Sequence, residues 1–222
     1  MNAVLFQYGP YFALFGFLAA RLYRWGILHD ETAPPATPVS PATEAALVLG
    51  CATLLVGHLT TAVAPGAMRA LVSDPDRVAV METIGLVGAL LFAWGVAARL
   101  RRRVQAWRAQ VPRQGGPVAV LALLLAVCLS GIYLTVSYRW ITVWYAYIFA
   151  PYTRSLLVAE PATAAVLASP WALRQHALLF MALVAAWPAG GLRLDEIFPL
   201  RAVARRFGEL GASEARVPEV RS

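Results

Sequence analysis

The sequence predicts an all-α, polytopic membrane protein folded as a bundle of five transmembrane helices. Hydrophobic residues make up 59% of the 222 residues and charged residues only 14%, whereas soluble proteins average about 25% charged residues. Apolar runs of roughly the 20 residues that cross a bilayer recur along the whole chain. We therefore expect one membrane domain over residues 1–206, followed by a polar, disordered cytoplasmic tail over residues 207–222.

The first three helices are expected at residues 8–23, 45–64 and 78–98. Pro10 is expected in the first turn of the first helix, where a residue without an N–H is tolerated. Ser40-Pro41 is a plausible start signal for the second helix. His29 lies in the Pro- and Thr-rich connection between these two helices and is expected to be a solvated loop residue.

The last two helices are expected at residues 117–136 and 172–187, and residues 188–192 extend the fifth, which is short by itself. A strongly basic connection, residues 100–116, precedes the fourth helix. A long connection, residues 139–170, follows it and is rich in tryptophan and tyrosine near its start.

The arginines indicate the orientation of the bundle. All 19 basic residues are arginines, of which 14 lie in or next to the segments that follow the first, third and fifth helices and 5 lie in or next to the other two connections. The positive-inside rule then places the N-terminus outside and the C-terminus in the cytoplasm, with the aromatic connection at the outer interface. The net charge of +7 is therefore interpreted as membrane topology, and we expect no nucleic-acid partner.

Two histidines lie inside the predicted helices, at nearly the same depth. His58 is six residues from Ala64, the outer end of the second helix, and His176 is four residues from Ala172, the outer start of the fifth. These spacings correspond to about 9 Å and 6 Å. An imidazole in hydrocarbon is costly unless something uses it, so a shared b-type haem is the favoured interpretation. Gly57 would let a flat macrocycle approach the backbone of the second helix.

Other uses of these histidines remain open. They could serve a proton site in a small transporter, or hydrogen bonds between helices in a haem-free membrane anchor for a catalytic partner. A visible spectrum of the purified protein separates these readings. The cysteines, Cys51 and Cys128, are expected to be small core residues, and the lack of a Cys-x-x-Cys motif excludes a covalent c-type haem within this chain.

Several motifs carry a resemblance to a known family. They are Tyr152-Thr153-Arg154-Ser155-Leu156, Glu160-Pro161, Ser169-Pro170-Trp171 ahead of His176, Gly57-His58 followed by Pro65, and Phe198-Pro199-Leu200. Over about Tyr8 to Arg206 the chain resembles the gamma subunit, a membrane cytochrome b, of respiratory nitrate reductases. The resemblance implies a five-helix subunit of the bacterial or archaeal cytoplasmic membrane, with its N-terminus outside.

The resemblance also implies an electron-transfer role, with no substrate-reduction site in the chain itself. Such subunits oxidise a quinol and pass electrons through two b haems to an iron–sulfur subunit, and then to a molybdenum subunit that reduces nitrate. His58 and His176 match the ligands of the outer haem. The positions that match the inner pair hold Val48 and Leu194, which cannot ligate iron, so we expect one haem.

The remaining site residues also follow from the resemblance. The family uses a lysine in the outer loop before the third helix to bind the quinone. Arg77 lies within one position of that place and could hydrogen-bond a quinone carbonyl, although the alternative is an ordinary interfacial anchor. Glu82, expected at the start of the third helix, is a candidate acceptor of a quinol proton, although a carboxylate is favoured at any helix N-terminus. Three outer arginines could pair with haem propionates or simply anchor the interface: Arg139, Arg154 and Arg174.

Overall fold

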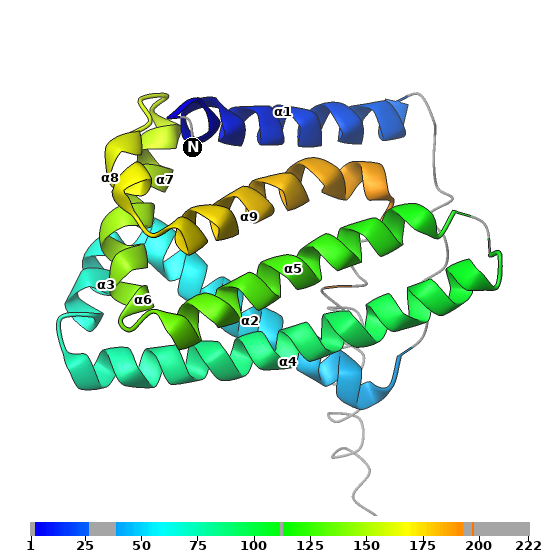
Figure 1. Ribbon diagram of the computed structural model, residues 1–222, viewed down its shortest axis with the longest axis horizontal. Coiled ribbons are helices and arrows are strands. Elements are labelled where there is room, and N and C mark those ends of the chain that lie inside the picture. Colours follow the sequence, from blue (N-terminus) through cyan, green and yellow to red (C-terminus); the bar gives the residue numbers. More distant parts are fainter. Residues whose placement is uncertain (1–2, 27–38, 112, 193–196, 198–222) are drawn as a thin grey trace, which may run out of the picture.

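The computed structural model describes residues 3–26, 39–111, 113–192 and 197, and this part of the chain is helical and contains no strand. Five long helices occupy the five expected apolar runs (Figure 1). They are α1 (Ala3–Gly26), α2 (Pro41–Val63), α4 (Pro75–Arg108), α5 (Gly115–Ser137) and α9 (Trp171–Gly190). The prediction of an all-α fold is therefore confirmed.

Short helices fill the connections at one end of the bundle. They are α3 (Pro65–Leu71), α6 (Ile141–Trp144), the π-helix η1 (Tyr145–Phe149), α7 (Ala150–Leu157) and α8 (Thr163–Ala168). All of them lie on the left in Figure 1, at the end where α2 and α5 finish and α4 and α9 begin. We call this end the outer end of the bundle, following the orientation predicted from the arginines.

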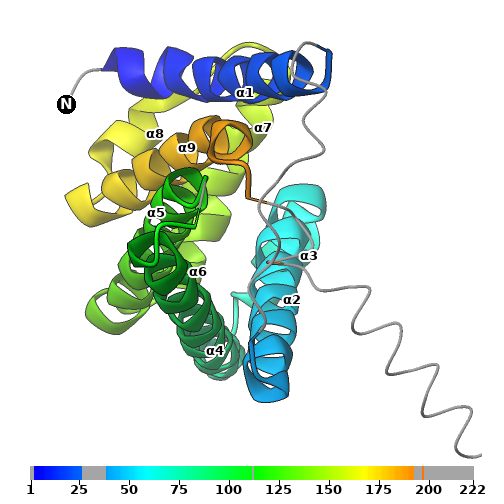
Figure 2. The ribbon, with the colours of Figure 1, turned by 90° about the vertical axis from the view of Figure 1, so that its right-hand side faces the viewer.

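The long helices pack in the order α1, α9, α5, α4, α2, each mainly against the next. In Figure 2, α2 stands to one side of the row formed by α4, α5 and α9. The helix pair α2 and α9 is not among the main contacts of the fold. The bundle therefore brings the two histidine-bearing helices to the same end without packing one directly on the other.

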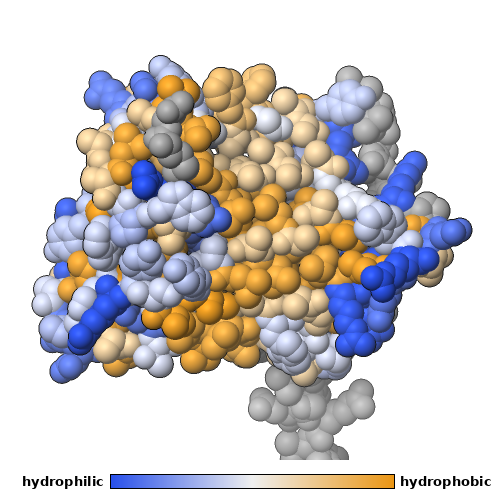
Figure 3. All heavy atoms as spheres, in the orientation of Figure 1, coloured by the Kyte–Doolittle hydropathy of each residue, from blue (hydrophilic) through white to orange (hydrophobic). Residues whose placement is uncertain are grey.

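The surface is consistent with a membrane protein. Figure 3 shows apolar side chains across the middle of the molecule and hydrophilic side chains at both ends. Within the described ranges, four helices are long and apolar enough to cross a membrane: α1, α2, α4 and α5. Helix α9 is also 20 residues long, but Arg174, Gln175 and His176 in its first turns lower its mean hydropathy.

The start of α2 agrees with the sequence prediction. Ser40 is the N-cap residue, and its hydroxyl accepts a hydrogen bond from the backbone N–H of Thr43 at 3.3 Å. Pro41 follows in the first turn, where a residue without an N–H leaves no hydrogen bond unmade. These residues fix where α2 begins and hence the depth of His58 along it.

The prediction that Pro10 lies in the first turn of the first helix was wrong. Helix α1 begins at Ala3, so Pro10 lies inside it. A proline inside a helix cannot donate to the carbonyl four residues earlier, here that of Phe6. The Tyr152 hydroxyl of α7 donates to this Phe6 carbonyl instead. Tyr152 and Phe6 are both buried, at 3% and 0% exposure. A tyrosine of the outer segment thus replaces the bond that Pro10 removes.

Helix α4 is longer than predicted and includes arginines that we expected in a connection. Its 34 residues span about 50 Å, against about 30 Å for the hydrocarbon core. Arginine is a good helix former, and no glycine or proline interrupts the chain between Gly95 and Pro112. Arg103 is fully buried, and its Nη1 donates to Oε1 of Gln114 at 2.8 Å.

Some predictions fall on residues outside the described ranges. These are His29, Leu194, the Phe198-Pro199-Leu200 motif and the tail over residues 207–222. They stay predictions.

Candidate functional site

His58 and His176 lie at matching positions on antiparallel helices. Five residues separate His58 from Val63, the last residue of α2, and five separate His176 from Trp171, the first residue of α9. Each histidine is therefore about 7.5 Å along its helix from the outer end.

The ring of His176 rests against α5. Its Nδ1 is 2.8 Å from the Ser130 hydroxyl, and that hydroxyl donates to the carbonyl of Val127, also at 2.8 Å. A hydroxyl carries one proton, which here goes to Val127, so Ser130 accepts its second bond from Nδ1–H of His176. This assignment leaves Nε2 of His176 as the nitrogen with the free lone pair.

Gly131 provides the space for this ring. A Cβ atom at Gly131 would lie only 3.2 Å from Cε1 of His176, a closer contact than side chains normally make. This role of Gly131 was not predicted from the sequence. The residue is needed here for the histidine of α9 to approach α5.

His58 is held differently, by its own helix and by an aromatic neighbour. Its Nδ1 is 2.8 Å from the carbonyl oxygen of Leu54, one turn earlier in α2. A carbonyl only accepts, so Nδ1 carries the proton and Nε2 again has the free lone pair. The ring of Tyr145 in η1 meets the imidazole edge-on, with centroids 5.2 Å apart and an interplanar angle of 62°. The His58 side chain is otherwise exposed.

This pair of donors suits an iron porphyrin. A metal-binding histidine typically donates its second N–H to a carbonyl or another acceptor, which fixes the tautomer and orients the ring. Both histidines have that arrangement, with Leu54 and Ser130 as the acceptors. A b-type haem with bis-histidine ligation takes two such axial nitrogens. Among the described residues, no three or more His, Cys, Asp or Glu lie together in a way that could hold a metal ion.

Comparison with models of known protein families identifies the family of this chain. The family model described as nitrate reductase gamma subunit matches residues 2–194. The chain belongs to the nitrate reductase gamma subunit family. The resemblance seen in the Gly57-His58 and Tyr152–Trp171 motifs is thereby confirmed, and the family is that of a subunit of an oxidoreductase. No curated protein matches the chain.

The most specific motif of the gamma subunit resemblance, Tyr152 to Leu156, has a clear structural part. Tyr152 bonds to α1 as described, and the Ser155 hydroxyl donates to the Tyr152 carbonyl at 2.6 Å. Ser155 also accepts from the N–H of Ala162 at 2.9 Å, which closes the turn between α7 and α8. Arg154 is exposed, so its charged side chain remains available for another role.

The other outer arginines do not converge on the histidines. The Arg139 guanidinium lies 5.1 Å from the centroid of the Trp140 ring. Arg174 and His176 are two residues apart on α9, so their side chains leave the helix about 200° apart. Gly57, by contrast, borders open space, because a Cβ atom there would meet nothing within 4 Å.

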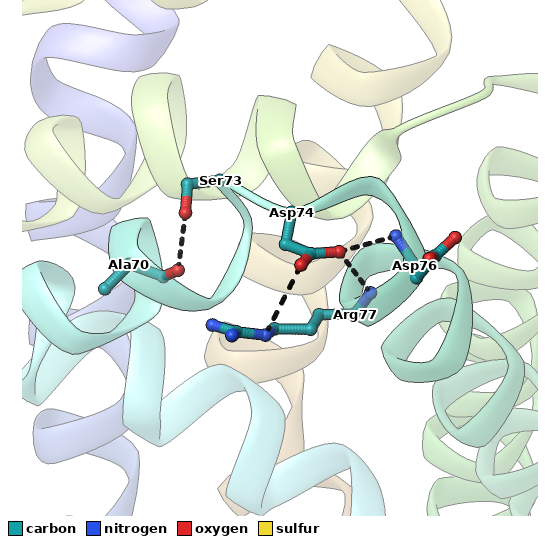
Figure 4. A network of polar contacts seen from close by, with 5 residues as sticks. All are labelled: Ala70, Ser73, Asp74, Asp76 and Arg77. Atoms are coloured by element: carbon teal, nitrogen blue, oxygen red, sulfur yellow. Dashed lines mark hydrogen bonds and ion pairs between the residues drawn. The ribbon is translucent and has the colours of Figure 1, made fainter.

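Arg77 and Glu82 lie on α4 but face different ways. Arg77 is in the first turn of α4, not in a loop, and its Nε is 3.7 Å from the carboxylate of Asp74, the N-cap residue (Figure 4). Its side chain is 60% exposed. Glu82 is five residues further along α4, and not at the helix start as expected. Five residues correspond to about 140° around a helix, so Arg77 and Glu82 lie on different faces of α4.

Glu82 is engaged at the start of another helix. Its carboxylate accepts a hydrogen bond from the backbone N–H of Thr142 in α6 at 3.1 Å. The first N–H groups of a helix have no partner inside it, and a carboxylate there is also favoured by the helix dipole. Glu82 therefore anchors α6 to α4. Helix α6 continues into η1, whose first residue, Tyr145, contacts His58.

Two neighbours of the histidines, Ser130 and Tyr145, were not singled out from the sequence. Ser130 is one of few polar residues in the apolar run of α5 and precedes Gly131, which was a usable signal. Tyr145 was one of several aromatic residues in its connection. The sequence did not indicate that η1 would direct this ring, and not another, toward His58.

Proposed function

We propose that this chain is a membrane cytochrome b that binds one haem through Nε2 of His58 and Nε2 of His176. The observation that carries the proposal is the shared tautomer of two imidazoles at equal depth, each with its Nδ1–H engaged. When bound, the haem supplies a one-electron carrier. The protein supplies the two axial nitrogens, their orientation and an apolar surrounding.

The inner half of the bundle supports one haem rather than two. Val48 stands where the resemblance implies an inner ligand, and its neighbours Leu47 and Cys51 belong to the main apolar core, at 0% and 5% exposure. A Cβ atom at Gly50 would lie 2.5 Å from the backbone nitrogen of Phe92 in α4. Helices α2 and α4 are therefore in close contact at the level of Val48, whereas residues 55–59 of α2 are exposed.

We further propose that electrons pass from a membrane quinol, through this haem, to iron–sulfur and molybdenum subunits of a nitrate reductase-like oxidoreductase. Family membership supports this assignment. With one haem near the outer end, about 20 Å of the ~30 Å hydrocarbon core separates it from the cytoplasm. A partner that accepts electrons must therefore reach into that gap with its own redox group, or dock at the outer end.

The test is the haem content of the purified subunit, produced with ample haem. We expect a reduced b-type spectrum and one haem per polypeptide. His58→Ala and His176→Ala should each abolish the low-spin spectrum, because each removes one of two axial ligands. A content near two would show that an inner site persists. A content near zero would overturn the cytochrome proposal in favour of a haem-free anchor or a proton-coupled transporter.

For the quinol site we propose Arg77, which is exposed at the outer end of α4 and can donate hydrogen bonds to a quinone carbonyl. Arg77→Ala should slow haem reduction by added quinol while the haem content stays unchanged. Arg69→Ala, which removes another exposed arginine of the outer end, is the matched control and should leave the reduction rate unaltered. Equal rates in both variants and the wild type would reject a role for Arg77.

Glu82 can be assigned by two substitutions that separate proton acceptance from helix capping. Glu82→Gln keeps an oxygen that accepts the Thr142 N–H but cannot take a proton, whereas Glu82→Ala removes both properties. Slow quinol oxidation in both variants indicates proton acceptance. Slow oxidation in Glu82→Ala alone indicates that Glu82 acts through the cap on α6.

A further inference from the structure

We propose that Ser130 is the positioning residue for His176, setting both its tautomer and the electron density that it gives to the iron. This inference rests on the proposed haem ligation by His176. Ser130 lies on α5 and His176 on α9, so the hydrogen bond at 2.8 Å joins two helices. The direction of the bond follows from the proton count at the hydroxyl, since Val127 receives the only O–H.

Two features of α5 act together on the ring. The Ser130 oxygen fixes the orientation of Nδ1, while the missing side chain of Gly131 leaves space on the Cε1 side, where a Cβ would come within 3.2 Å. The imidazole therefore has one orientation in which Nδ1–H is paired, and this orientation presents Nε2 as the donor.

The opposite ligand, His58, has a backbone carbonyl of its own helix as its acceptor, and not a side chain of another helix. Nδ1 of His58 bonds to the carbonyl of Leu54, four residues earlier in the same helix. Any α-helix offers a carbonyl at this position, whatever its sequence. An acceptor that pairs with Nδ1–H makes the other ring nitrogen more basic, and a hydrogen bond of this kind to a ligating histidine tunes the bound metal. Ser130 is therefore the side chain through which the bundle sets the His176 end of the axial pair.

The variants to compare are Ser130→Ala, Ser130→Thr and Ser130→Cys, with Thr135→Val as the matched control. Thr135 is also on α5, and its hydroxyl donates to the Gly131 carbonyl at 3.0 Å within the helix. Ser130→Thr keeps the acceptor, Ser130→Cys offers a weak one, and Thr135→Val removes a hydroxyl that does not touch His176. Helical content and thermal unfolding of each variant report whether it folds.

The expected result for Ser130→Ala is a loss of haem affinity of about 10- to 100-fold and a rise in the haem midpoint potential. The potential rises because a less basic imidazole stabilises the ferric state less. Ser130→Thr should restore both quantities, Ser130→Cys should fall between, and Thr135→Val should match the wild type. A merely structural hydroxyl would affect folding without this ordered change of potential.

The two proposals fail in distinguishable ways. A wild-type protein without haem contradicts the proposed function itself. A wild-type protein that binds haem, with Ser130→Ala unchanged in both affinity and midpoint potential, overturns the role of Ser130 alone. If Ser130→Ala does not fold, the potentials of Ser130→Cys and Ser130→Thr still decide, because equal potentials in the folded Ser130→Cys variant and the wild type would reject the proposal.

Discussion

At the scale of single residues, a hydrogen bond between distant segments replaces a helical hydrogen bond that a proline removes. Pro10 leaves the Phe6 carbonyl without its helical partner, and the hydroxyl of Tyr152 supplies a donor from 146 residues away. Burial, and secondarily the neighbouring Tyr11, raises the pKa of Tyr152 to about 12. The hydroxyl therefore keeps its proton, and remains a donor, throughout the physiological pH range.

This arrangement predicts coupling between two distant substitutions. Tyr152→Phe should destabilise the protein by about 1–3 kcal/mol, because it leaves the Phe6 carbonyl buried and unpaired. In a Pro10→Ala background the alanine N–H can satisfy that carbonyl, so the same Tyr152→Phe substitution should cost clearly less. The measurement is a double-mutant cycle of unfolding free energies in detergent. Additive effects would contradict the link between Pro10 and Tyr152.

Among single residues, the sequence could predict the depth of the two histidines but not the side chains that contact them. The depths of His58 and His176 could be predicted, because helix rise converts residue number into distance. The partners Ser130 and Tyr145 could not, since they depend on how α5 and η1 are rotated against α9 and α2. The explanation given for Pro10 was wrong because the helix begins at Ala3, five residues before the start of the expected run.

At the scale of elements, apolar runs located the long helices to within a few residues at most ends. The exception was the C-terminal end of α4, where a run of arginines was interpreted as a connection although it continues the helix to Arg108. Charge marks where a helix leaves the hydrocarbon, not where it ends. The short helices α3, α6, α7 and α8 were not predicted, since segments of 4 to 8 residues give no clear periodic signal.

Two glycines of α2 provide a comparison of close packing with open space. Gly50→Ala should destabilise the protein by about 1–3 kcal/mol, because its Cβ would overlap the backbone of Phe92. Gly57→Ala meets no protein atom, so it should be neutral or slightly stabilising through the better helix propensity of alanine. Unfolding free energies of both variants check this. Loss of haem affinity in Gly57→Ala, without loss of stability, would place the macrocycle against that position.

At the scale of the whole molecule, we propose that α9 is a fifth transmembrane helix and that the N-terminus lies outside. Helix α9 packs between α1 and α5, both of which can span a membrane, and its polar residues are confined to the first turns. The arginine distribution supports the orientation. Five spans place the two chain ends on opposite sides.

A topology reporter tests the fifth span and the orientation together. A reporter fused after Ser222 should be active in the cytoplasm, and one placed in the segment 27–38 should also be cytoplasmic. A fusion between Ala159 and Ala162 should be exported, because this turn lies at the outer end between α7 and α8. An exported signal from Ser222, with the other two as expected, would mean that α9 does not cross the membrane.

The separation of α2 from α9 has a consequence for the order of biosynthesis. One proposed iron ligand is on the second long helix to leave the ribosome and the other is on the last, and the two helices are joined mainly through α4 and α5. If the haem is the piece that bridges them, it can enter only after the final helix has been inserted. Maturation would then act as a proofreading step, in which a truncated chain never acquires its pigment.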